Sequence, residues 1–98
     1  MNINEKKDGT RLIIELEGRL DTITAPQLED RIKKDIAGVD EFVLDLALLS
    51  YISSAGLRVL LAAQKIMNGQ GQMKVRNVND TVMEVLEITG FSDILTIE

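Results

Sequence analysis

The stretch LDLALLSYISSAGLRVLL, residues 44–61, runs from an apolar segment through a short polar one into a second apolar segment. With the two residues before this stretch, the first apolar segment covers residues 42–46. Its apolar residues are nearly continuous rather than alternating, which is typical of a strand covered on both faces. Residues 51–56 are predicted to form a turn. From residue 54 to about residue 67, apolar side chains occupy most of the helical circumference, which indicates a packed helix. We therefore expect a central strand that turns directly into a helix, a junction at which ligands and partners often bind.

The predicted helix has one stripe without large apolar side chains. Its only charged residues are Arg58 and Lys65, and on a helical wheel they share a face with Ser54 and Ala62. We expect this stripe to face solvent, and the small Ala62 would let a partner helix or loop approach closely. Ser53 fits the N-cap position, and a serine before an apolar helix is more often a cap than a functional group. A phosphate on Ser54 would be favoured by the free N–H groups and the macrodipole of the helix start.

Two extended segments and a helix are predicted upstream. Residues 2–6 and 11–17 read as strands, and the Asp8-Gly9 dipeptide favours a tight antiparallel hairpin between them. An amphipathic helix follows. The expected boundary residues are Gly18 at the end of the second strand, Thr24 as N-cap and Pro26 in the first turn of the helix, and Gly38 at its carboxyl end.

Downstream, residues 73–75 read as a strand and residues 94–97 as a short last strand. Asn79 is the expected N-cap of a helix between them, which Gly90 should end. The element order predicts an α/β fold in a single domain over residues 1–98. Its mixed, mostly parallel sheet would have four to five strands, with an N-terminal hairpin and three to four helices packed against it.

Composition excludes several classes of function. The 98 residues include no cysteine and no histidine, so disulfides, thiol nucleophiles, imidazole bases and histidine-ligated metals are absent. The formal charge is −5 and the Lys and Arg residues are scattered, which argues against nucleic acid as a partner. No apolar run approaches ~18 residues and no signal peptide is evident, so we expect a cytoplasmic protein that does not insert into membranes.

Three spaced motifs resemble the STAS domain, and specifically the stand-alone anti-sigma-factor antagonists of bacteria, over nearly the whole chain. The matching residues are Gly18-Arg19-Leu20-Asp21, Leu44-Asp45-Leu46 and Tyr51-Ile52-Ser53-Ser54-Ala55-Gly56-Leu57. At two positions the chain departs from the family pattern: Ser53 stands where Asp is usual, and Arg58 stands where Gly is frequent.

The resemblance implies a STAS-like regulator that is not an enzyme and needs no cofactor. Unphosphorylated, it would bind an anti-sigma factor with serine kinase activity. Phosphorylation of Ser54 by that partner would break the complex, and a serine phosphatase would restore it. The implied partner-binding residues are Asp21, Thr22, Ser53, Ser54, Ala55, Gly56, Arg58, Ala62 and Lys65. Arg58, one helical turn after Ser54, is expected to pair with the phosphate.

Other interpretations remain open. A STAS subunit could dock constitutively in another complex, such as a membrane transporter assembly, without phosphorylation. An enzyme using Ser54 as nucleophile is disfavoured because no base lies near it in sequence. A receiver-like phosphoaspartate switch is disfavoured because no acidic cluster would hold magnesium, and Asp45 is interpreted as structural. Gly56 and Asp21 also have purely structural roles available, in close packing and in a turn.

Overall fold

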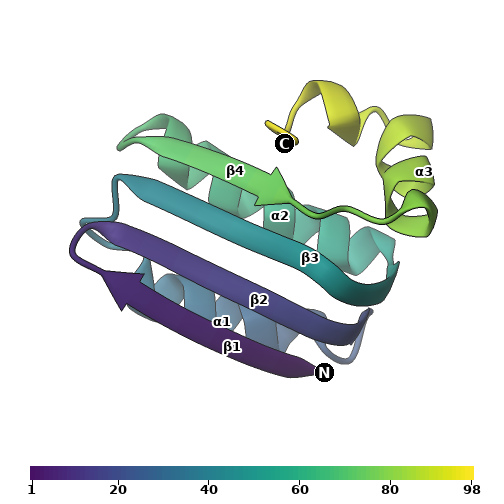
Figure 1. Ribbon diagram of the computed structural model, residues 1–98, viewed down its shortest axis with the longest axis horizontal. Coiled ribbons are helices and arrows are strands. Elements are labelled where there is room, and N and C mark those ends of the chain that lie inside the picture. The colour runs from purple at the N-terminus through teal and green to yellow at the C-terminus, as the bar shows by residue number, and fades with distance from the viewer.

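A four-stranded sheet with two helices on one face forms the body of the protein, and the computed structural model describes all 98 residues (Figure 1). The strands are β1 (Asn2–Asp8), β2 (Arg11–Leu20), β3 (Glu41–Ile52) and β4 (Gln72–Arg76). The helices are α1 (Ala25–Asp35), α2 (Ser54–Asn68) and α3 (Asp80–Ile88), with a 3₁₀ turn at Phe91–Asp93. The strand order is β1-β2-β3-β4, with β1 antiparallel to β2 and the remaining pairs parallel. The predicted α/β class, N-terminal hairpin and mixed sheet are confirmed.

The two crossover helices cover the same face of the sheet. Figure 1 shows α1 and α2 together behind the strands, with α3 beside the carboxyl end of β3. Because the sheet grows in one direction from β2 to β4, right-handed crossovers must place both helices on one side. The residues of β2 that face them, Leu12, Ile14 and Leu16, are fully buried, as their alternation predicts.

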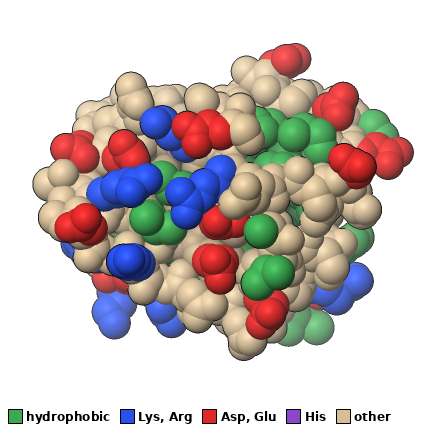
Figure 2. Space-filling view, in the orientation of Figure 1, with side chains coloured by type: hydrophobic (Ala, Val, Ile, Leu, Met, Phe, Trp, Pro, Cys, Tyr) green, Lys and Arg blue, Asp and Glu red, His purple; other side chains and the backbone are tan.

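The central strand is buried on both faces. In β3, the residues from Phe42 to Leu46 are all buried, and β2 and β4 flank them. Phe42 and Leu44 face the helices. On the helix-free face, the carboxylate of Asp45 is covered by Arg76 of β4 and by Asn77, which follows that strand. Figure 2 shows that face, where Lys and Arg side chains are interleaved with Asp and Glu.

Both strands that lead to the α1 and α2 helices are longer than predicted. The expectation that Gly18 ends β2 is wrong, because the strand continues to Leu20 through a register shift after Gly18. Gly18 has φ +108, a value that other residues rarely adopt, so the strand bends there without ending. In β3, Tyr51 and Ile52 belong to the strand, since Leu20 pairs with Ile52. The predicted turn therefore shrinks to Ser53.

The carboxyl-terminal segment is not the predicted last strand. It contains the 3₁₀ turn and then a single parallel bridge between Ile97 and Val75. The amide of Val75 donates to the carbonyl of Thr96 at 2.8 Å, and the amide of Glu98 donates to the carbonyl of Val75 at 2.9 Å. This pairing is a single bridge and does not make a strand of several residues.

The predicted boundaries are correct for α3 but not for the carboxyl end of α1. Asn79 caps α3 by accepting from the amide of Val82 at 2.9 Å, and Gly90 follows it with φ +80, so both expectations are confirmed. Helix α1 instead ends at Asp35, with Ile36 as its C-cap. Gly38 adopts φ +77 in the turn that follows and does not cap the helix directly.

Candidate functional site

The junction between β3 and α2 consists of one residue, Ser53. It is extended, with φ −98 and ψ 175, and its Oγ accepts a hydrogen bond from the amide of Gly56 at 3.4 Å. Its own amide donates to the carbonyl of Leu20 at 2.9 Å, which ties the start of α2 to the end of β2. The predicted N-cap role of Ser53 is confirmed.

Ser54 occupies the first position of α2 and is exposed. Its hydroxyl forms no hydrogen bond within the chain. The first N–H groups of any helix lack intrahelical acceptors. Here the side chain of Ser53 accepts that of Gly56, and the Leu57 amide donates the first helical hydrogen bond to the Ser53 carbonyl. The N–H groups of Ser54 and Ala55 are left without such a partner. The geometry thus presents a free hydroxyl beside free backbone donors.

Gly56 lets α2 approach the sheet closely. A Cβ atom at this position would lie 2.7 Å from Cγ of Leu20 and 3.0 Å from Cγ1 of Ile52, closer than packed carbon atoms approach. The structural role expected for Gly56 is therefore supported, because any side chain would push the start of the helix away from β2 and β3.

Asp21 organises the loop between β2 and α1. Its Oδ1 accepts from the amides of Ile23 and Thr24, both at 3.0 Å. The Thr24 side chain also bonds to this loop. Its Oγ1 accepts a hydrogen bond from the amide of Asp21 at 2.8 Å and donates one to the carbonyl of Arg19 at 2.7 Å. The hydrogen bond from the Thr24 amide is the main reason that the pKa of Asp21 lies below its ordinary value. Thr24 is the N-cap residue of α1, as predicted, but its hydroxyl forms hydrogen bonds within this loop and makes no capping hydrogen bond to the helix.

A surface depression of about 190 Å³ lies between the amino-terminal turns of α1 and α2. It is lined by Thr22, Ala25, Pro26, Glu29, Ala55, Arg58 and Val59. The structure thus brings Thr22, from the loop before α1, together with Ala55 and Arg58 of α2. We name this feature the α1–α2 depression.

The exposed stripe of α2 is present as predicted. Ser54, Arg58, Ala62 and Lys65 are all exposed, and we call them the α2 stripe. The opposite side of the helix is buried in the core. Ile66, an apolar residue of the same helix, is 40% exposed.

The whole chain matches one protein family. Residues 2–98 match the STAS domain. The chain belongs to the STAS family. It is 41% identical over 95 residues to BtrV of Bordetella bronchiseptica, which is named as an anti-sigma factor antagonist, covering 95% of this chain and 81% of BtrV.

Solved structures confirm the STAS fold. A crystal structure from Thermotoga maritima, titled as that of an anti-sigma factor antagonist, has a TM-score of 0.89 at 20% identity and covers 97% of this chain and 84% of that one. The Bacillus anti-sigma factor antagonist SpoIIAA matches in its unphosphorylated form, with a TM-score of 0.79 at 19% identity, covering 99% of this chain and 87% of SpoIIAA. Its phosphorylated form matches with a TM-score of 0.78 at 19% identity, covering 99% and 91%.

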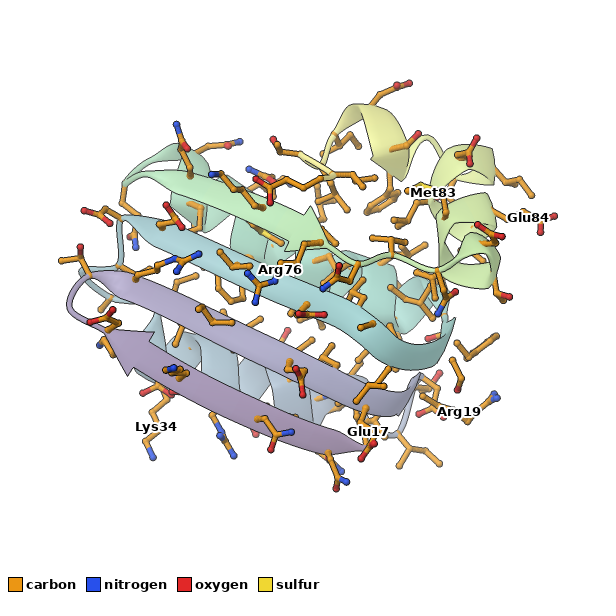
Figure 3. The ribbon with its side chains drawn as sticks, viewed as in Figure 1. Glu17, Arg19, Lys34, Arg76, Met83 and Glu84 are labelled. Atoms are coloured by element: carbon orange, nitrogen blue, oxygen red, sulfur yellow. The ribbon has the colours of Figure 1, made fainter.

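Asp45 of this STAS domain is held by three donors on the helix-free face of the sheet. Its carboxylate accepts from the amide of Ala47 at 3.0 Å, from Nε of Arg76 at 3.1 Å and from Nδ2 of Asn77 at 3.1 Å. Figure 3 shows Arg76 lying over this face, away from the helices. Burial alone would raise the pKa of Asp45, but these hydrogen bonds outweigh it, and the pKa lies below its ordinary value. These contacts support the structural interpretation.

Sequence reasoning did not foresee several residues of the STAS site. Pro26, Glu29 and Val59 line the α1–α2 depression, but nothing in their spacing indicates that α1 and α2 lie side by side. Arg19 was also missed: its guanidinium lies 4.3 Å from the ring centroid of Tyr51 and 3.8 Å from Oδ2 of Asp21. The sequence could have indicated the contact between Arg19 and Tyr51 only through the expectation that both lie near the ends of adjacent parallel strands. No helix combines the length and hydropathy that a membrane-spanning helix needs.

Proposed function

We propose that this STAS domain is a cytoplasmic anti-sigma-factor antagonist that regulates transcription by partner switching. In its unphosphorylated form it binds an anti-sigma factor that is also a serine kinase. Phosphorylation of Ser54 ends that interaction, and a serine phosphatase reverses the modification. The domain itself catalyses nothing and uses no cofactor.

The observation that carries this proposal is the free, exposed hydroxyl of Ser54 at the start of α2. Ser53 takes the capping role, so the modification of Ser54 removes no hydrogen bond that the fold uses. A phosphate there meets free backbone donors and the positive end of the helix dipole. The relative BtrV, named as an anti-sigma factor antagonist, supports the proposed antagonist function, and the match covers 81% of its length.

Phosphorylation with purified components tests the proposal. The protein is incubated with an anti-sigma factor of the serine kinase type and ATP, and the product is examined by intact mass and peptide fragmentation. One phosphate on Ser54 is expected, and Ser54→Ala should take up none. Ser50→Ala is the control, since Ser50 is also exposed and lies four residues earlier. A phosphate on another residue, or an unaltered mass, contradicts the proposal.

The partner-binding step is tested by size-exclusion chromatography. The unphosphorylated protein should elute with the anti-sigma factor, and the phosphorylated protein should elute alone. A constitutively docked STAS subunit predicts a different result: Ser54→Ala would support full function in cells, because no release step is needed. Under the proposed function, Ser54→Ala holds the anti-sigma factor permanently and leaves the sigma factor active without a signal.

A further inference from the structure

Some of the positively charged side chains of the protein form ion pairs with carboxylates, and others do not. Most of its Lys and Arg side chains form ion pairs within 4 Å, among them Arg76 with Asp45 at 3.1 Å and Lys33 with Glu29 at 3.5 Å. Five Lys and Arg side chains have no such pair, and two of them lie on α2. The five are Lys6 and Lys7 of β1, Lys34 of α1, and Arg58 and Lys65 of α2.

The α2 stripe is thus an unpaired basic surface on an acidic protein. Helix α2 contains no Asp or Glu, whereas the whole chain has a formal charge of −5. The one acid that lines the α1–α2 depression, Glu29, is already paired with Lys33. Arg58 therefore borders a depression whose lining includes the apolar side chains of Ala25, Ala55 and Val59, and it forms no ion pair with a carboxylate of this chain.

We propose that the α2 stripe and the α1–α2 depression bind an acidic segment of the partner protein, with Arg58 and Lys65 as the residues that recognise its carboxylates. This inference rests on the proposed function and specifies the chemistry of the partner surface. The opposite charges of the stripe and the segment favour association. The apolar residues that line the depression offer a contact to a small apolar side chain of that segment.

The position of Arg58 explains how a phosphate on Ser54 ends this interaction. Side chains of a helix lean toward its amino terminus, and residues four apart are neighbours with Cβ atoms about 6 Å apart. A phosphate on Ser54 therefore lies within reach of the Arg58 guanidinium, which forms strong paired hydrogen bonds with phosphate. Once Arg58 binds the phosphate, it is no longer available to the partner. The phosphate also adds about −1.5 to −2 charges where the acidic segment would bind.

Binding to the anti-sigma factor at several salt concentrations tests the recognition step. The double variant Arg58→Gln/Lys65→Gln should bind about fivefold to tenfold more weakly at low salt, and its affinity should depend less on salt. Lys6→Gln/Lys7→Gln is the matched control, since it removes the same charge from two unpaired lysines of β1, outside the proposed docking surface, and it should bind like wild type. Equal weakening by both double variants, or wild-type binding that is insensitive to salt, overturns the inference and leaves the proposed function intact. A wild-type protein that binds no anti-sigma factor contradicts the proposed function itself.

The capture of Arg58 is tested without any partner. Phosphoserine is installed at position 54 during synthesis, and the second pKa of the phosphate is measured by ³¹P NMR. In wild type this pKa should be lower than in Arg58→Gln by roughly 0.3 to 1 unit, because the guanidinium stabilises the dianion. Lys65→Gln, three turns along the helix, is the control and should leave the value unchanged. The same pKa in wild type and Arg58→Gln overturns the capture of Arg58.

Discussion

Two adjacent serines have different roles because the backbone changes conformation between them. Ser53 is extended, which turns its Oγ back toward the first turn of α2, whereas Ser54 is already helical and projects into solvent. Capping depends on a residue with non-helical dihedral angles, so only Ser53 can fill that role. The result is a helix whose start is stabilised independently of the residue that we propose as the phosphate acceptor.

At the same scale, Gly56→Ala should destabilise the protein. The added Cβ would lie 2.7 Å from Leu20 Cγ, and relieving that overlap should cost more than the helix propensity of alanine returns. We expect a net loss of about 1–2 kcal/mol in the free energy of unfolding, measured by urea denaturation. Gly69→Ala is the matched control, because its Cβ meets only the Ile66 carbonyl at 3.5 Å and should be tolerated. Equal stability of the two variants would contradict the packing role of Gly56.

Asp45→Asn tests the buried carboxylate. Wild-type Asp45 has a lowered pKa, so its contribution to stability is present above the ordinary value of 3.8 and is lost as the pH falls through the folded-state pKa. At pH 7 we expect the variant to lose about 2–3 kcal/mol, because a charge-assisted hydrogen bond with Arg76 is removed. Below pH 4 the difference should shrink. Asp21 also has a lowered pKa, but it is present in both proteins and affects them alike. If the stability difference between wild type and Asp45→Asn stays constant with pH, this role of Asp45 is contradicted.

At the scale of elements, Glu5 of β1 lies against Arg31 and Asp35 of α1. The Glu5 carboxylate accepts from Nη1 of Arg31 at 3.3 Å. Its pKa is raised, first by burial and then by Asp35 of the same helix. The folded state therefore binds this proton more tightly than the unfolded state does. Stability falls as the pH rises from the ordinary value of 4.5 through the folded-state pKa.

Replacing Glu5 by Gln should consequently stabilise the protein near neutral pH. The neutral amide avoids the burial of a charge beside Asp35, and we expect a gain of up to about 1 kcal/mol in the free energy of unfolding. That gain should vanish in acid, where wild-type Glu5 is protonated. Glu84→Gln on α3, whose side chain points into solvent in Figure 3, is the control. A loss of stability in Glu5→Gln at pH 7 would show that the ion pair with Arg31 outweighs burial.

Sequence patterns located the elements of this fold better than their ends. Alternation in β2 and the apolar run of β3 depend on which face is buried, and that information lies within each segment. The ends depend on partners: β3 reaches Ile52 only because Leu20 is there to pair with it, and β2 reaches Leu20 only because Gly18 bends. Residues 94–97 had the composition of a strand, but they form only one bridge to Val75.

At the scale of the whole molecule, the candidate site combines one predictable part and one unpredictable part. The α2 stripe follows from helical periodicity alone, so its exposed residues were predicted correctly. The α1–α2 depression exists because both crossovers are right-handed and place α1 and α2 on the same sheet face. The contribution of Glu29 and Val59 is a property of that tertiary arrangement and has no local sequence signal.

The same arrangement predicts that phosphorylation of Ser54 leaves the fold unchanged. No hydrogen bond of the fold uses the Ser54 hydroxyl, the core cluster does not include Ser54, and a phosphate at the start of α2 interacts favourably with the helix dipole. We expect the phosphorylated protein to unfold at the same temperature or a few degrees higher, since about 0.3–1 kcal/mol is gained. In ¹H–¹⁵N NMR spectra, shift changes should be confined to the start of α2 and the loop between β2 and α1. Changes that extend to β4 or α3 would contradict a surface mechanism, because the phosphate would then act by rearranging the core instead of by altering the charge at the docking surface.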